Sequence, residues 1–163
     1  MSINLTHTLL VALQNEIVKL QRLQQEIIEN QADFAQEPPI TSRDLRGIAS
    51  MLADIFQGAE NVFQRIARAT NEGLPTGKQW HRQLLNQMSQ EIPAVRIPVI
   101  QPETHALLEE YRSFRHRDRH NYGFTLVWDK MGPLFATAET TIQLLINDLE
   151  TFCHFLAQLS SDA

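Results

Sequence analysis

The sequence is poor in several residue types, and each shortage narrows the class of protein. Its 163 residues include one cysteine, Cys153, which excludes an internal disulfide framework and both common zinc-finger spacings. No charge-free run of about 18 or more apolar residues occurs, so we expect no membrane-spanning segment. No Lys or Arg precedes Lys19, so the basic start of a secretory signal is missing. We therefore expect a cytoplasmic protein.

Basic residues are also outnumbered. The chain has 14 Lys and Arg against 19 Asp and Glu, for a formal net charge of −5. This balance argues against a protein that coats nucleic acid without selectivity. With 43% hydrophobic residues, the length suits one domain over residues 1–163 with a core of its own.

Apolar residues recur at steps of three and four through most of the chain, which is the spacing of buried helix faces. Pro93, Pro98 and Pro102 punctuate a segment rich in Val and Ile. We therefore expect an irregular connector there, and no strand over residues 95–100. The pattern predicts an all-α, antiparallel bundle of four long helices and one short helix. The expected helices cover residues 4–30, from Thr41 or Ser42 to before Gly73, 77–90, from Pro102 to before Gly123, and 129–159.

The basic residues are concentrated in one segment. Residues 111–122 hold four Arg, two His and one Asp, so they carry +3 with neutral His, and the rest of the chain must carry −8. Arg grips phosphate through its planar fork, and a neutral imidazole near pH 7 takes a proton from a hydroxyl. Arg with His is therefore a sufficient set for metal-free RNA cleavage, in which His activates the ribose 2′-hydroxyl and Arg stabilises charge on the phosphate.

Within this segment Arg115, His120 and Tyr122 have the spacing Arg-x4-His-x-Tyr. This matches the RX4HXY motif of HepT-like ribonuclease toxins, which belong to the HEPN superfamily of helical RNA-cleaving domains. His116 fits the polar position that follows the motif arginine. Residues 78–85 and 122–124 also resemble a HepT-like subgroup.

The resemblance implies a function. The chain would be an endoribonuclease toxin, with His120 as general acid/base, Arg115 as the clamp on phosphate and transition state, and His116 as a secondary polar member. Its substrate would be tRNA or another cellular RNA. An antitoxin of the minimal nucleotidyltransferase (MntA-like) type would neutralise it by transferring AMP to Tyr122. The added bulk and negative charge would then occupy the place of substrate phosphate.

The motif spacing raises a geometric difficulty. Residues five apart on a helix, such as Arg115 and His120, point about 140° away from each other. Either the helix unwinds near Asn121 and Gly123, or a second subunit completes the site. Since HEPN proteins are typically dimers with both motifs facing one cleft, we expect a homodimer.

Further basic residues extend the expected RNA-binding surface: Arg112, Arg117, Arg119, Arg82 and Lys78. His81 beside Trp80 is either a stacking platform for a base or a half-buried packing pair. Cys153 lies among Phe152, Phe155 and Leu156 and is expected in the core. We expect no cofactor and no metal site, although the four-residue spacing of His116 and His120 would suit a metal on one helix face.

Two other functions stay open. The same basic segment would serve a non-catalytic helical module that binds RNA or a protein. A bundle-type metallohydrolase is the other alternative, although neither an HExxH motif nor paired ExxH motifs occur in the sequence.

Overall fold

The computed structural model describes residues 3–39, 41–120 and 126–161, with the side chains of residues 3, 4 and 118–120 outside the description. Five helices cover most of this part, and none of its residues forms a strand. The prediction of an all-α bundle with four long helices and one short helix is confirmed. The helices are α1 (Ile3–Asp33), α2 (Ser42–Ala69), α3 (Trp80–Met88), α4 (Pro102–His120) and α5 (Trp128–Ser161).

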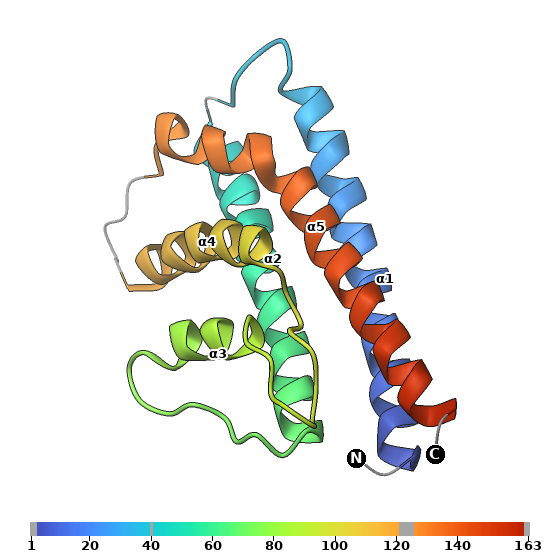
Figure 1. Ribbon diagram of the computed structural model, residues 1–163. Helices are drawn as coiled ribbons and strands as arrows, with labels where there is room; N and C mark the ends of the chain where they lie inside the picture. The colour runs from blue at the N-terminus through green and yellow to red at the C-terminus, as the bar shows by residue number, and fades with distance from the viewer. Residues whose placement is uncertain (1–2, 40, 121–125, 162–163) are drawn as a thin grey trace.

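The long helices α1, α2 and α5 form one side of the molecule. In Figure 1, α1 runs beside α5 along most of its length, and the N and C ends lie at the same end of the bundle. On the other side of α2, α4 crosses it and α3 lies next to α4. The basic segment therefore reaches the core through α2 and α5 rather than through α1.

Local chemistry sets where α2 begins and how closely it approaches α1. Thr41 is the N-cap, with its Oγ1 accepting the backbone N–H of Asp44 at 3.1 Å. Near the middle of α2, a Cβ on Gly58 would lie 2.9 Å from Cδ2 of Leu20 in α1. Glycine at this position lets the two helices pack closely.

The connector over residues 89–101 is irregular, as predicted, with one isolated bridge between Ile92 and Arg96. The Arg96 side chain is fully buried and binds both carboxylate oxygens of Glu72, at 2.6 and 2.7 Å. It also donates to the carbonyls of Gln87 and Gln90. A bidentate buried ion pair thus holds the connector to the loop that follows α2, and the bond to Gln87 ties it to the end of α3. The sequence suggested only prolines as constraints on this connector.

This pair predicts a loss of stability in acid. Burial raises the pKa of Glu72, but hydrogen bonds from Arg96, Thr70 and Gln87 outweigh burial and leave the pKa below its ordinary value of 4.5. A lowered carboxyl pKa stabilises the fold above the unfolded-state pKa, and this stabilisation is lost as pH falls through the folded-state pKa. Urea unfolding at pH 6 and pH 3 should show a smaller acid-induced loss for Glu72→Gln than for the wild type. Equal losses in both proteins would contradict this account.

The face of α4 that meets the core carries Tyr111 and Phe114. The Tyr111 hydroxyl donates to the carbonyl oxygen of Leu134 in α5 at 2.7 Å, and the Tyr111 side chain is fully buried. At the start of α4, Asp148 of α5 accepts from the backbone N–H of Gln101 and from Thr104, at 2.9 and 2.6 Å. These contacts fix both the rotation of α4 and the direction of Arg115, one turn after Tyr111.

Within the described part of the chain, no helix combines the length and the apolar character needed to cross a bilayer.

Candidate functional site

A cavity of about 710 Å³ lies beside the basic segment, where α2, α3 and α4 meet. We call it the basic pocket. Three lining residues are permanently cationic and two are histidines, and no acid is among the described residues that line it. The lining residues are Phe56, Gly77, Lys78, Trp80, His81, Arg112, Arg115 and His116. Such a surface favours an anionic ligand.

Arg115 is the motif residue whose surroundings are described most fully. Its side chain is 9% exposed, and Nη1 lies 3.3 Å from Oε1 of Glu60 in α2. Nη2 donates to Oε1 of Gln57, one turn earlier on the same helix. The guanidinium carbon lies 5.9 Å from the centre of the Phe56 ring. Arg115 is thus held against α2 by a buried carboxylate, an amide and an aromatic ring.

Glu60 is a site residue that the sequence reasoning missed. It is 2% exposed and pairs with Arg115 from α4 and with Nδ1 of His81 from α3. The helical spacing did contain a signal, because Glu60 lies four residues after Phe56 and three before Phe63, which are both buried. A lone acid on a buried helix face requires a partner, and here it has two.

Arg112 is paired as well. Its Nε and Nη2 donate to the two carboxylate oxygens of Glu109, at 2.7 and 2.8 Å. Hydrogen bonds from Arg112 are the main cause of a lowered pKa at Glu109, and they raise the pKa of Arg112. Arg82 binds Oε1 of Glu109 at 3.1 Å from outside the basic pocket. The positive charge of residues 111–122 is therefore partly neutralised by carboxylates from outside this segment. Glu109 lies one turn before Arg112 in α4, and Glu60 lies in α2.

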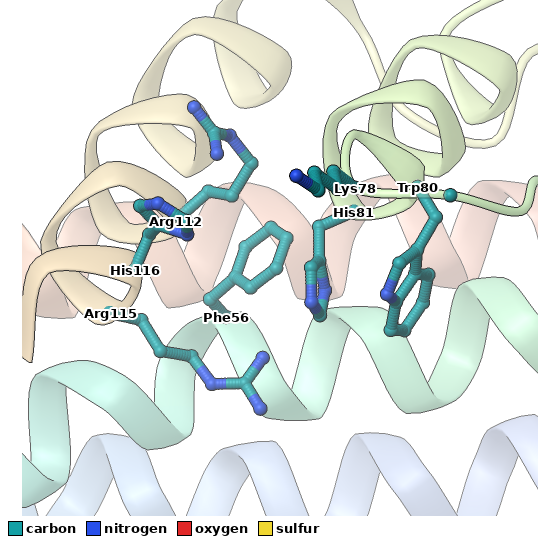
Figure 2. A pocket seen from close by; sticks show the side chains of 8 residues that line it. Phe56, Lys78, Trp80, His81, Arg112, Arg115 and His116 are labelled. Carbon is teal, nitrogen blue, oxygen red and sulfur yellow. The ribbon is translucent and has the colours of Figure 1, made fainter. Parts of the chain in front are cut away.

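The other predicted RNA-binding residues are dispersed. Lys78 is exposed and lines the basic pocket, as does the exposed His116. Arg117 is also exposed, but it lines a separate hollow with Glu110 and Lys130. Figure 2 shows Lys78 on one wall of the basic pocket, with Arg112 and His116 on the opposite wall.

Three predicted residues cannot be placed in this geometry. The backbone of α4 remains helical as far as His120, but the side chains of Arg119 and His120 lie outside the described residues. Tyr122 and the expected unwinding near Asn121 and Gly123 also lie outside them. Of the motif and its neighbouring position, only Arg115 and His116 are therefore described as lining the basic pocket.

Trp80 and His81 form a stacked pair, with ring centroids 3.7 Å apart and an interplanar angle of 29°. Both are half-buried, which agrees with a packing pair. Because the two rings cover each other's inner faces, a stacking base would have to use an outer face of one of them.

Two remaining expectations concern cysteine and metal. Cys153 is buried, as predicted, and burial raises the pKa of its thiol to about 11, which keeps it protonated and unreactive at neutral pH. Among the residues that the structure describes, no three His, Cys, Asp or Glu side chains gather as a metal-binding group.

Comparison with known proteins gives one match. A family model described as HepT-like protein matches residues 47–156, about two-thirds of the chain. The match runs from α2 to α5 and contains every lining residue of the basic pocket. Comparisons with curated proteins and with solved structures returned no match.

Proposed function

Since the chain belongs to the HepT-like protein family, we propose that it is a HEPN-type endoribonuclease, the RNA-cleaving toxin of a toxin–antitoxin system in the cytoplasm. The observation that carries this proposal is the basic pocket, a single cavity that is lined by Lys78, Arg112, Arg115 and His116. Its positive charge suits a phosphodiester backbone.

The catalytic roles follow from residue chemistry. His120 is the general acid/base, and Arg115 stabilises negative charge on the phosphate in the transition state. A guanidinium has five N–H donors, and the bonds to Glu60 and Gln57 use two of them, so Arg115 retains capacity for phosphate. Its fixed position supports this role, because a donor that is already oriented does not reorganise during the reaction. His116 orients His120 or contacts RNA.

RNA binding extends beyond the catalytic groups. Lys78 and Arg112 contact phosphates inside the basic pocket. Arg82, Arg117 and Arg119 extend the contact with the RNA strand. Charges spread over α3 and α4 suit a cellular RNA such as tRNA. A homodimer, with the α4 segments of both copies at one cleft, would bring a second Arg–His set to the substrate. Sedimentation of active protein tests this part, and a monomer that still cleaves RNA would contradict it.

The direct test of function is cleavage of total RNA and purified tRNA by the unmodified chain in excess EDTA. We expect cleavage to persist, because Arg and His supply charge stabilisation and proton transfer without a metal ion. Loss of cleavage on chelation, restored by a divalent ion, would contradict the metal-independent mechanism.

Tyr122 is the proposed site of regulation. Co-expression with a cognate nucleotidyltransferase should add AMP to Tyr122 and abolish cleavage, because the adenylate phosphate would compete for the place of substrate phosphate. Intact-mass and peptide mass spectrometry measure the modification. The Tyr122→Phe variant should stay unmodified and active under the same co-expression. Inhibition without any modification of Tyr122 would contradict this mechanism.

One observation favours a second function, a non-catalytic module that binds RNA or a protein. Arg82, Arg112 and Arg115 all have carboxylate partners within the chain, as structural arginines do. This function predicts RNA binding without cleavage, weakened by Arg115→Ala and unchanged by His120→Ala. Electrophoretic mobility shifts with both variants distinguish it from the ribonuclease.

A further inference from the structure

We propose that His81 is a second acid/base residue of the basic pocket and that Glu60 positions it. The inference deepens the proposed ribonuclease function and rests on it. It assigns a catalytic role to a residue of α3, a helix that carries no part of the RX4HXY motif.

The first step is the buried carboxylate. Glu60 is 2% exposed and contacts Arg115 on one side and Nδ1 of His81 on the other. One carboxylate therefore fixes two side chains from different helices relative to each other. If Glu60 served only to hold Arg115 in place, its contact with His81 would not be needed.

The second step is the tautomer. An ionised carboxylate accepts hydrogen bonds and does not donate them, so Nδ1 of His81 carries the proton in this contact. In the neutral imidazole, Nε2 then carries the lone pair and is the basic atom. Among the described residues, Nε2 of His81 has no hydrogen-bond partner. A carboxylate that orients an imidazole in this way is a recurring device for general bases.

The third step is the location. The His81 side chain is 28% exposed and lines the basic pocket. In Figure 2, His81 and His116 lie on opposite sides of the Phe56 ring, on α3 and α4 respectively. Trp80 stacks on one face of His81, which leaves the ring little freedom to rotate.

The charges around His81 suit a phosphodiester between the two walls. Glu60 on α2 is the carboxylate in contact with the imidazole, and Lys78 precedes α3. From α4, Arg112, Arg115 and His116 line the same cavity. The phosphate would lie among these cations, with the ribose 2′-hydroxyl at Nε2 of His81.

The chemical step balances without a metal. Nε2 of neutral His81 takes the proton of the 2′-hydroxyl, the 2′-oxygen bonds to phosphorus, and the bond from phosphorus to the 5′-oxygen breaks. The protonated imidazole of His120, the general acid/base of the proposed function, gives its proton to the departing 5′-oxygen. The products are a 2′,3′-cyclic phosphate and a 5′-hydroxyl, and the two histidines end with their protonation exchanged.

The test uses His81→Asn, whose side-chain amide replaces the Nδ1–H donor toward Glu60 but lacks Nε2. Steady-state cleavage of a fluorescent RNA oligonucleotide in EDTA should show kcat lowered by about 100-fold, with KM changed by less than about threefold. His81→Ala should be equally slow, and added imidazole should restore about tenfold of its rate. A purely structural role for His81 would give no rescue.

His105→Asn is the matched control, since His105 is a half-buried histidine of α4 that bonds to Asn86 away from the basic pocket. It should cleave at the wild-type rate. For Glu60, the ¹⁵N shifts of the His81 ring should report the Nδ1–H form in the wild type and a mixture of tautomers in Glu60→Gln.

The two possible failures are distinguishable. Wild-type rates in His81→Asn, no imidazole rescue of His81→Ala, or an unchanged tautomer in Glu60→Gln would overturn this inference and leave the ribonuclease function intact. A wild-type chain that cleaves no RNA would remove the proposed function itself and the proton-transfer role with it.

Discussion

The Glu60→Ala variant is expected to unfold with a free energy about 3–5 kcal/mol lower than that of the wild type. The substitution leaves the Arg115 guanidinium, 9% exposed, without its carboxylate partner inside the bundle. It also removes the hydrogen-bond partner of His81. Breaking one side of a buried ion pair is costly because the remaining charge is neither hydrated nor paired. Urea unfolding followed by circular dichroism measures the effect.

Two variants control for the loss of side-chain volume and of charge. Glu139→Ala removes an exposed carboxylate from the middle of α5 and should change the free energy by less than about 0.5 kcal/mol. The double variant Glu60→Leu with Arg115→Met removes both charges, so it should be less destabilised than Glu60→Ala. A Glu60→Ala protein within about 1 kcal/mol of the wild type would contradict the role given to this ion pair.

The second large effect concerns His120. The His120→Ala variant is expected to cleave RNA about 10²- to 10⁴-fold more slowly than the wild type, which is the contribution typical of a general acid/base. Its fold should be unchanged, because α4 is already fixed upstream by Tyr111 and by Asp148 of α5. Rates with labelled RNA and thermal unfolding of the same preparations provide the two readouts.

The control for this substitution is His154→Ala, which removes an exposed histidine of α5 outside the basic pocket. It should keep the wild-type rate. Cleavage by His120→Ala at the wild-type rate would overturn the assignment of His120, even if other variants abolished activity.

The fold was predictable because its signals are local and periodic. Apolar residues at steps of three and four predicted the five helices of the described chain. Of the two predicted N-cap candidates of α2, Thr41 is the N-cap, and Pro102 begins α4 as predicted. The predicted helices extended too far at the end of α2 and at both ends of α3. The helix α2 ends at Ala69, and α3 begins at Trp80 rather than near Gly77, because glycines with positive φ at 73 and 77 belong to the intervening loop.

The site was predictable only in part. The spacing of Arg115 and His116 on one helix was visible in the sequence, and both line the basic pocket. The carboxylate partner of Arg115 was not visible, because Glu60 lies 55 residues away in the chain and a pairing between distant residues produces no periodic pattern in the sequence. The net charge of residues 111–122 therefore hides that Arg112 and Arg115 bind carboxylates outside this segment. The same reason hid the pairing of Arg96 with Glu72, 24 residues apart.

The net charge of the whole chain differs in sign from the charge that lines the basic pocket. The value of −5 describes an acidic chain, yet the described lining of the basic pocket holds three permanent cations and no acid. Glu60 and Glu109 bind the arginines that line it, so they fix these side chains while reducing the local charge. This arrangement favours a bound phosphate at a defined place over general attraction to nucleic acid.

The most direct test of the central claim is the chemistry of the RNA ends. A defined RNA oligonucleotide is incubated with the unmodified wild-type chain in EDTA, and its products are analysed by mass spectrometry. Activation of the 2′-hydroxyl predicts a 2′,3′-cyclic phosphate on one fragment and a 5′-hydroxyl on the other, with His120→Ala forming both at the reduced rate given above. Intact RNA under these conditions, or fragments that carry a 5′-phosphate and a 3′-hydroxyl, would contradict the account.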